Sequence, residues 1–423
     1  MTTESMVAAT SDSSTAIVDH YLPTIVVFSS LFPSSAQPNA GLFIRERMFR
    51  LRPYARGLIV VAPQPWFPFQ SFLRLIKPGY RPTPPKTEIQ DGVTVLFPRF
   101  LSVPGLFRWL DSFSMAVCTF LVMRRLRHDW QVGIIDAHFA YPCGHAAVLL
   151  GRWLGLPVSI TLRGTEVSIS ATRWRRRLML LAVNQADQVI SVSDSLRRHL
   201  ADCGADARRI EVVGNGVDSH RFIPMPRAEA RTALGVAEDA LVLISVGGLV
   251  ERKGFHRVIE QLPGLLEQYP KLRYLIVGGG GPEGDWRSRL ESQVRQLQLT
   301  SVVTFLGPLP PDELKGPLSA SDVFVLATRN EGWANVFLEA MACGLPVVTT
   351  DVGGNQEVVC DSKLGMIVPF GDGYALSQAL RSALSKPWDR LVIRQYAEAN
   401  DWQTRVNRLY QLFALLTKRQ QSF

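Results

Sequence analysis

The stretch that decides the fold is residues 241–254, which read LVLISVGGLVERKG. Its first six residues form a near-continuous apolar run, typical of a strand buried on both faces of a parallel sheet. Two glycines follow, which permit close backbone approach to a ligand, and Arg252 and Lys253 supply a positive charge suited to a pyrophosphate. The stretch therefore predicts a phosphate-binding loop after a strand, although solvated basic residues at a loop tip would look similar.

The same strand pattern recurs on both sides of this stretch. The β-branched runs fall at residues 24–29, 57–62, 93–97, 132–136, 157–162 and 188–192, then at 241–246, 273–277, 302–305, 323–327 and 346–350. Most are separated by helix-length segments, the pattern of parallel strands joined by crossover helices. We therefore predict an α/β fold of two doubly wound domains that face an interdomain cleft.

The prolines of residues 222–226 break the periodicity and mark the linker. We predict a loose tail over residues 1–20, an N-terminal domain over 21–220 and a C-terminal domain over 221–385. Residues 386–423 should form a helical segment that packs back toward the N-terminal domain.

Composition excludes several classes of protein. With 423 residues, 47% hydrophobic and 20% charged, the chain is too apolar for global disorder and too long for one domain. No apolar stretch approaches the roughly 20 residues of a membrane helix, and residues 1–20 lack the features of a signal peptide. Five scattered cysteines argue against a disulfide framework or zinc site, so we expect a cytoplasmic protein.

The net charge of +9 lies entirely in the first half. Residues 1–215 hold 24 Lys and Arg against 15 Asp and Glu, whereas residues 216–423 hold 22 of each kind. Aromatic residues cluster at 66–69, and aromatic and apolar residues interleave with arginines at 72–77, 107–110 and 173–177, which favours an anionic membrane surface as partner. Ordinary core packing is the alternative for some of these aromatics. No nucleic-acid motif accompanies them, so we expect no nucleic-acid partner.

A second informative stretch is residues 331–339, EGWANVFLE, between two predicted strands. Apolar residues recur there at helical spacing, which predicts a helix from about Asn335 to a C-terminal glycine, Gly344. Glu331 and Glu339 would flank the helix start, where carboxylates can accept hydrogen bonds from sugar hydroxyls. A glutamate favoured only by the helix dipole is the alternative.

Residues 279–284, GGGPEG, match a dinucleotide-binding fingerprint. The next predicted strand, however, ends without an Asp or Glu to hold a ribose, and Pro282 interrupts the turn. We therefore do not expect a nicotinamide cofactor.

Taken in order, residues 215–222, 246–254, 278–281, 331–346 and 353–357 resemble glycosyltransferase family 4, the group 1 retaining enzymes of GT-B fold with two Rossmann-like domains. Residues 136–142 and 161–166 are similar to members that build bacterial cell-surface polysaccharides. The resemblance implies a UDP- or GDP-linked sugar donor held by the C-terminal domain and a lipid-linked or glycan acceptor held by the N-terminal domain. Together with the basic first half and its aromatic segments, this predicts a cytoplasmic enzyme that lies peripherally at the inner face of the cell membrane.

The resemblance assigns roles to individual residues. Glu331 would hold donor-sugar hydroxyls, Glu339 the nucleotide ribose, and Arg252 and Lys253 the leaving diphosphate. The remaining donor-binding candidates are backbone or loop positions, namely Gly41, Arg163, Gly247, Gly248, Gly332, Trp333, Ala334, Asn335 and Val336.

Two positions depart from the family pattern. Gly248 stands where many members have Arg, and Arg163 stands where many have an active-site histidine, which makes His138 the nearest candidate for that catalytic role. A histidine satisfied by backbone at a strand end is the alternative. The sequence contains no D-x-D pair, so we expect neither a metal nor another cofactor. A nucleotide-sugar-binding scaffold with weak or no turnover is the alternative function.

Overall fold

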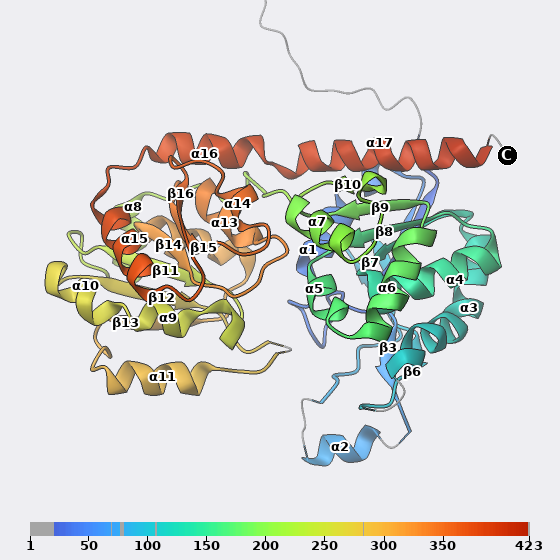
Figure 1. Ribbon diagram of the computed structural model, residues 1–423, viewed down its shortest axis with the longest axis horizontal. Coiled ribbons are helices and arrows are strands. Elements are labelled where there is room, and N and C mark those ends of the chain that lie inside the picture. The colour runs from blue at the N-terminus through green and yellow to red at the C-terminus, as the bar shows by residue number, and fades with distance from the viewer. Residues whose placement is uncertain (1–20, 69, 77–79, 106–107, 282, 422–423) are drawn as a thin grey trace, which may run out of the picture.

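The computed structural model describes residues 21–68, 70–76, 80–105, 108–281 and 283–421. The predicted tail over 1–20, and Phe69, Lys77 and Phe107 of the predicted membrane-facing segments, lie outside the described residues. Two α/β domains lie next to each other, and the C-terminal helices run across both (Figure 1).

The N-terminal domain is built on a sheet that, in the described residues, has eight strands in the order β10-β9-β8-β7-β1-β2-β5-β4. All neighbouring strands are parallel except β4 and β5. The strands are β1 (Thr24–Phe28), β2 (Leu58–Val61), β4 (Thr87–Gln90), β5 (Val93–Leu96), β7 (Val132–His138), β8 (Val158–Leu162), β9 (Gln188–Ser191) and β10 (Ile210–Val212). A separate parallel pair is formed by β3 (Gln64–Trp66) and β6 (Arg99–Leu101).

Helices cover both faces of this sheet, so its central strands are buried on both sides. One core lies under α3, α4, α6 and α7, and the other lies under α1 and α17. The helices are α1 (Leu42–Phe49), α2 (Gln70–Ile76), α3 (Asp111–Asp129), α4 (His145–Leu154), α5 (Thr165–Ser170), α6 (Arg173–Gln185), α7 (Asp194–Asp202) and α17 (Trp402–Gln421).

The C-terminal domain has a parallel sheet of order β13-β12-β11-β14-β15-β16, again covered on both faces. Its strands are β11 (Val242–Val246), β12 (Arg273–Val277), β13 (Val303–Gly307), β14 (Val323–Leu326), β15 (Val347–Thr350) and β16 (Gly365–Val368). Its helices are α8 (Arg227–Ala233), α9 (Phe255–Ile259), α10 (Leu262–Gln268), α11 (Arg287–Gln296), α12 (Lys315–Ala320), α13 (Asn335–Ala342), α14 (Asn355–Val358), α15 (Gly373–Ser385) and α16 (Arg390–Ala399). The predicted fold of two doubly wound domains is confirmed.

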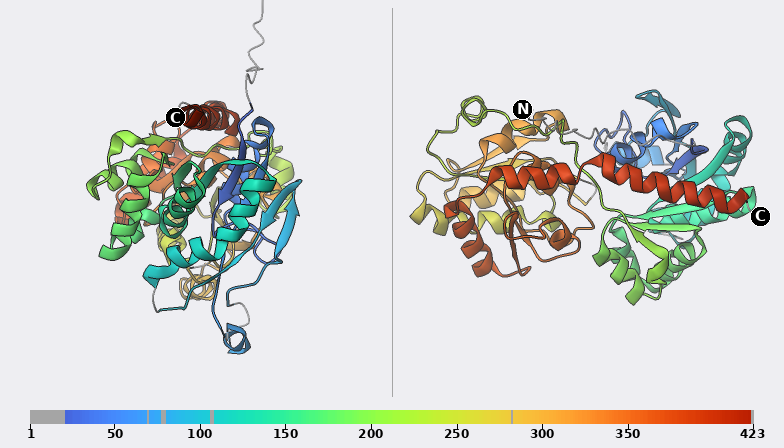
Figure 2. Two further views of the ribbon diagram at one scale, coloured as in Figure 1. Left: turned by 90° about the vertical axis from the view of Figure 1, so that its right-hand side faces the viewer. Right: turned by 90° about the horizontal axis from the view of Figure 1, so that it is seen from above.

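The chain crosses between the domains twice, at the same place. The amide of Val217 donates to the carbonyl of Asn400 at 3.1 Å, and the amide of Trp402 donates back to Val217 at 3.1 Å. A Cβ on Gly216 would lie 2.6 Å from the Trp402 nitrogen, so the crossings touch. Beyond them, α17 places apolar side chains in the N-terminal core and lies along the top of that domain (Figure 2).

Every predicted strand is present, and so is the helix from Asn335. Five short strands were missed, namely β3, β4, β6, β10 and β16. Among the described residues, no helix combines the length and apolarity that a membrane span requires.

Candidate active site

The loop after β11 is held against neighbouring strand ends by glycines. A Cβ on Gly254, whose φ is 76°, would lie 1.9 Å from the carbonyl oxygen of Ala327, just after β14. A Cβ on Gly278, whose φ is 148°, would lie 1.8 Å from the carbonyl oxygen of Gly247. Only glycine fits at these two positions. The loop consequently carries the short helix η5 (Glu251–Lys253) to the carboxyl edge of the sheet.

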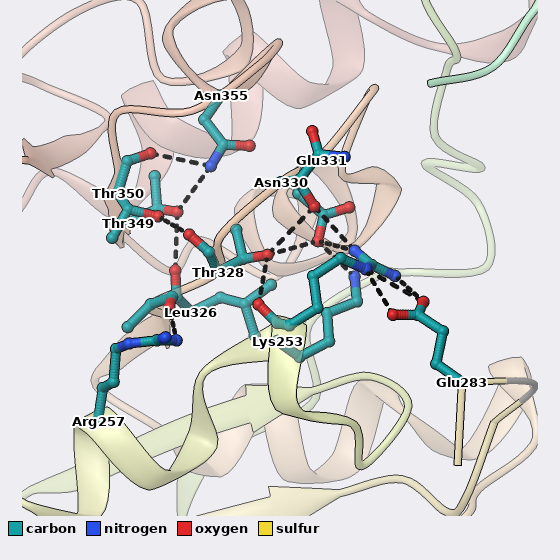
Figure 3. Close-up of polar contacts among 12 residues, drawn as sticks. Lys253, Arg257, Glu283, Leu326, Thr328, Asn330, Glu331, Thr349, Thr350 and Asn355 are labelled. Atoms are coloured by element: carbon teal, nitrogen blue, oxygen red, sulfur yellow. Dashed lines mark hydrogen bonds and ion pairs between the residues drawn. The ribbon is translucent and has the colours of Figure 1, made fainter. Parts of the chain in front are cut away.

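The buried carboxylate of Glu331 is the centre of a polar cluster at this edge (Figure 3). Its Oε1 accepts hydrogen bonds from Lys253 Nζ at 2.7 Å and from Thr328 Oγ1 at 3.1 Å. Arg252 Nη1 lies 3.3 Å from the same oxygen, and its Nη2 donates to Glu283 Oε1 at 2.8 Å. The structure therefore brings together three residues predicted for the diphosphate and the sugar, with the two cations engaged by carboxylates.

The charges of this cluster reinforce one another. Burial lowers the pKa of Arg252, but its hydrogen bonds and charge interactions with Glu283 and Glu331 outweigh burial and leave that pKa above its usual value. The hydrogen bond from Arg252 likewise lowers the pKa of Glu283. A diphosphate entering this place would compete with the carboxylates of Glu283 and Glu331 for these cations.

A second set of hydrogen bonds fixes the backbone beneath Glu331 (Figure 3). Thr350 Oγ1 donates to the carbonyl of Thr328 at 2.5 Å, and Asn355 Nδ2 donates to the carbonyl of Thr350 at 2.9 Å. A Cβ on Gly353 would lie 1.8 Å from the carbonyl oxygen of Glu331. The loop over residues 351–355 thus packs directly against the backbone of Glu331.

A chain of side-chain hydrogen bonds links the N-terminal domain to this region. Arg163 Nη2 lies 3.1 Å from His138 Nδ1, and Arg163 Nη1 donates to Asn215 Oδ1 at 2.8 Å. Asn215 Nδ2 then donates to Asn335 Oδ1 at 2.8 Å, at the first residue of α13. At the other end, His138 Nε2 lies 3.2 Å from Asp136 Oδ2. This series of hydrogen-bonded side chains therefore runs from β7 of one domain to α13, the helix that follows Glu331, in the other.

The partners of His138 determine its protonation. A guanidinium has only donors, so Nδ1 must accept and the ring proton must lie on Nε2, toward Asp136. The ring is 0% exposed, and burial lowers the pKa of His138 to about 4, although Asp136 raises it in part. His138 is therefore neutral and enclosed, and its contacts are with Arg163 and Asp136.

Glu166 was not singled out as a site residue, yet it orders the strand ends around Arg163. Its buried carboxylate accepts from the backbone amides of Ala140 at 3.0 Å, Arg163 at 3.1 Å and Gly164 at 2.8 Å. Three backbone donors converge on one carboxylate and fix the loops after β7 and β8 together. The signal in the sequence is its place at the end of the 161–166 segment, which resembles the family but gives Glu166 no role of its own.

Glycines allow the two domains to touch at the site. A Cβ on Gly164, whose φ is 109°, would lie 2.8 Å from the Cα of Gly332. Within the N-terminal domain, Gly41, with φ of 71°, is the N-cap residue of α1, and a Cβ there would lie 2.7 Å from the carbonyl oxygen of Leu31. The Arg163 guanidinium lies over the ring of Phe43, 5.3 Å from its centroid.

A cleft of about 1240 Å³ opens between the domains next to these contacts. One wall is formed by the glycine loops after β11 and β12, including Gly247 and Gly248. The opposite wall comes from the N-terminal domain and includes residues 37–40, Trp66, Tyr80, Arg81 and Arg99. Of the predicted donor-binding residues, Gly247 and Gly248 are the ones that line this cleft.

Two families of known proteins match this chain. Residues 226–400 match the family described as glycosyl transferases group 1, and residues 73–221 match Glycosyltransferase Family 4. D-inositol 3-phosphate glycosyltransferase of Corynebacterium urealyticum is 34% identical over 357 residues, which cover 78% of this chain and 82% of that protein. The chain belongs to the group 1 glycosyltransferases of family 4.

Other similar proteins agree with this placement. TuaC of Bacillus subtilis, named for teichuronic acid biosynthesis, is 28% identical over 366 residues, 86% of this chain and 88% of that protein. Sucrose-phosphate synthase of Thermosynechococcus elongatus aligns with a TM-score of 0.77 and 22% identity over 94% of this chain and all of that one. HepE of Anabaena in complex with UDP aligns with a TM-score of 0.70 and 20% identity over 93% and 99% of the two chains. The fold of the transferase is GT-B.

Glu339 of the transferase lies on α13, away from the Glu331 cluster. Burial raises the pKa of its half-buried carboxyl to about 7, with a further increase from Glu46 of α1 and a decrease from Arg221. Among the described residues, no hydrogen bond to this carboxylate is found. Glu339 thus has an unengaged carboxyl beside the opposite domain.

Trp333 packs between the two domains. A Cβ on Gly214 would lie 2.6 Å from its ring, and the guanidinium of Arg405, on α17, lies 6.0 Å from the ring centroid. The indole contacts the core of each domain, and its buried Nε1 has no partner in the described part of the chain. Of the neighbours of Trp333, Ala334 is buried and Val336 is half-buried.

Glu357, also missed as a site residue, joins the two domains through hydrogen bonds to α7. Its carboxylate accepts from the amides of Asp194 at 2.7 Å and Ser195 at 2.8 Å, the first residues of α7. A carboxylate at a helix N-terminus is favoured by the free amides and by the helix dipole. Glu357 ends the 353–357 segment of the family resemblance, which assigns it no role.

Proposed function

We propose that the protein is a retaining glycosyltransferase that moves a sugar from a UDP- or GDP-linked donor to a lipid-linked or polysaccharide acceptor during synthesis of cell-surface glycans. The observation that carries this proposal is the cluster of Glu331, Lys253 and Arg252 at the carboxyl edge of the second sheet. Open α/β sheets bind their ligands at that edge.

In this proposal, the donor exchanges partners with the cluster. Lys253 and Arg252 transfer from Glu331 and Glu283 to the diphosphate, where they stabilise the negative charge that develops as the nucleotide leaves. Glu331 is then free to accept hydrogen bonds from sugar hydroxyls. Arg252 takes the place of the cation that the family pattern has at Gly248, because it already reaches Glu331.

For His138, the geometry supports a positioning role. The ring is fully buried and neutral, and its Nδ1 holds Arg163. Arg163 in turn lies over the ring of Phe43 in α1, the helix that follows Gly41 and approaches the donor from the N-terminal domain. We propose that Arg163, together with the backbone at Gly41 and at residues 332–336, completes the donor site, and that Glu339 binds the ribose.

The acceptor side rests on the N-terminal wall of the cleft. Trp66 and Tyr80 offer aromatic faces on which sugar rings stack, and Arg81 and Arg99 offer positive charge for a phosphate. Relatives named for teichuronic acid and inositol phosphate support acceptors of these two kinds. The basic first half of the chain supports a place at the inner face of the cell membrane.

A donor screen tests this proposal. UDP- and GDP-sugars are offered to the full chain with and without membrane extract, and both nucleotide release and saturable donor binding are measured. Release with one donor, accelerated by extract, is expected. Tight donor binding with no release under either condition contradicts the proposal and favours a nucleotide-sugar-binding scaffold.

A further inference from the structure

The outer face of α3 carries an apolar stripe that the core does not use. Phe113, Val117 and Leu121 follow one another at four-residue spacing and are 52%, 50% and 57% exposed. Trp153 of the adjacent helix α4 is also exposed, and its ring meets Phe113 edge-on at 6.4 Å between centroids. Contiguous exposed apolar side chains of this kind mark an interaction surface.

Positive charge dominates the helices on this side of the N-terminal sheet. Together α3, α4 and α6 contain eight arginines and two aspartates, and no lysine or glutamate. Arg124 lies one turn beyond Leu121 on the same helix face, and Arg125 and Arg152 are exposed beside it. Within the described ranges, none of the eight arginines forms an ion pair with an acidic side chain. The aspartates are Asp111 and Asp129, one at each end of α3.

The position of this face relates it to the cleft. The α3 and α4 helices lie on the side of the N-terminal domain remote from the C-terminal domain (Figure 1). The inner side of α3, however, packs against β6, and Arg99 of β6 lines the acceptor wall of the cleft. A partner bound along the outer face of α3 would therefore be separated from the proposed acceptor site only by α3 and β6.

We infer that the α3 face, defined by Phe113, Val117, Leu121 and Trp153 with Arg124, Arg125 and Arg152, binds an anionic lipid surface. The apolar stripe enters the boundary between headgroups and acyl chains, and the arginines contact lipid phosphates. This inference rests on the proposed function, because membrane binding through the α3 face would bring a lipid-linked acceptor close to the cleft. It differs from the sequence-based expectation, which placed membrane contact on segments that include residues 173–177 but not α3.

Vesicle flotation tests the inference directly. The full chain is mixed with phosphatidylcholine vesicles with and without phosphatidylglycerol, and bound protein is measured. We expect the triple variant F113S/V117S/L121S to bind the anionic vesicles roughly tenfold more weakly. The matched control I89S/L391S/L415S, which removes three comparably exposed apolar residues outside α3, should bind as the wild type does.

A second variant keeps the test valid if the triple variant unfolds. R124S/R125S leaves the stripe intact and should lose the preference for phosphatidylglycerol over neutral vesicles. Unchanged vesicle binding by either folded variant overturns the inference, as does a wild-type protein that binds no vesicles or that forms a dimer dissolved by the triple substitution.

Donor hydrolysis in detergent-free buffer separates this inference from the proposed function. Loss of vesicle binding with hydrolysis retained supports the α3 face. Vesicle binding by a wild-type protein that hydrolyses no donor contradicts the proposed function and leaves the surface assignment standing.

Discussion

The two domains hold the charged groups of the site in opposite ways. In the C-terminal domain, Lys253 and Arg252 reach Glu331 through charged contacts of 2.7 and 3.3 Å that a diphosphate could replace. In the N-terminal domain, Arg163 is held by neutral acceptors, Asn215 and His138, in a buried chain. The first arrangement suits exchange with a ligand, and the second suits a fixed geometry. Substitutions in the C-terminal cluster should therefore lower activity alone, whereas substitutions around Arg163 should lower stability as well.

The largest effect on activity is expected from Lys253→Ala. Loss of one cation from the leaving diphosphate typically costs about a hundredfold in rate. Because Glu331 keeps its contacts with Arg252 and Thr328, the melting temperature should stay within about 1 °C of wild type. Steady-state kcat/KM and thermal unfolding measure the two quantities.

Glu283→Gln is the matched control for that prediction. It removes the negative charge of the second carboxylate of the cluster, which is hydrogen-bonded to Arg252, but Glu283 has no proposed contact with the sugar. Activity within about threefold of wild type is expected. A loss as large as that of Lys253→Ala would show that any charge change in this loop has the same effect, which argues against a specific role for Lys253.

Arg163→Met should instead lower stability as well as activity. It leaves Asn215 Oδ1 and His138 Nδ1 buried without a donor, and each unsatisfied acceptor costs about 1–3 kcal/mol. We expect the melting temperature of the N-terminal domain to fall by about 5 °C or more. Arg163→Lys keeps the charge without the planar fork and should give an intermediate loss. Equal stability of the wild type and Arg163→Met would show that the Arg163 contacts do not hold the N-terminal domain in a fixed geometry, which contradicts the contrast drawn between the two domains.

Glu339 provides a pH-dependent comparison. Its folded pKa of about 7 lies above the ordinary glutamate value of about 4.3, so the folded state holds the proton more tightly. The stability that this group contributes is fully present below its unfolded pKa of about 4.3 and is lost as the pH rises to and through its folded pKa of about 7. Glu339→Gln should therefore melt higher than wild type near pH 8 and equally near pH 4.

The affinity for the nucleotide should rise with pH, whereas the stability contributed by Glu339 falls. If the ionised carboxyl holds the ribose, affinity for the nucleotide rises by about tenfold between about pH 6 and about pH 8. Glu339→Gln should remove that rise. Calorimetric titration at both pH values measures it, and an identical pH profile in the variant would assign the ribose to another residue.

The sequence predicted those parts of the fold that depend on local patterns. Apolar β-branched runs identify strands buried on both faces, and every such run forms a strand. The missed strands are three or four residues long and include polar or half-exposed segments such as β4, over Thr87–Gln90, and a strand that begins with Gly365, β16. Their pairing depends on neighbours that are distant in sequence.

The same distinction between local patterns and distant contacts applies to the residues of the site. Lys253 and Glu331 follow adjacent strands of one sheet, so the topology that brings them together could be inferred. The roles of Glu166 and Glu357 depend on backbone amides that converge only in the folded protein. The neutrality of His138 depends on burial that no sequence window displays.

The smallest expected effect comes from removing divalent ions. Two protein cations, Arg252 and Lys253, already stand where a leaving diphosphate would need neutralising charge. A metal ion would supply the same stabilisation of the transition state, so transfer should proceed at an unchanged rate with excess chelator. The measurement is kcat/KM with chelator, with added magnesium and with added manganese. Complete loss of transfer in chelator, restored by either ion, would mean that Arg252 and Lys253 do not suffice to stabilise the leaving group. In that case Lys253→Ala should also become less damaging when the ion is present, because the metal and Lys253 would stabilise the same charge.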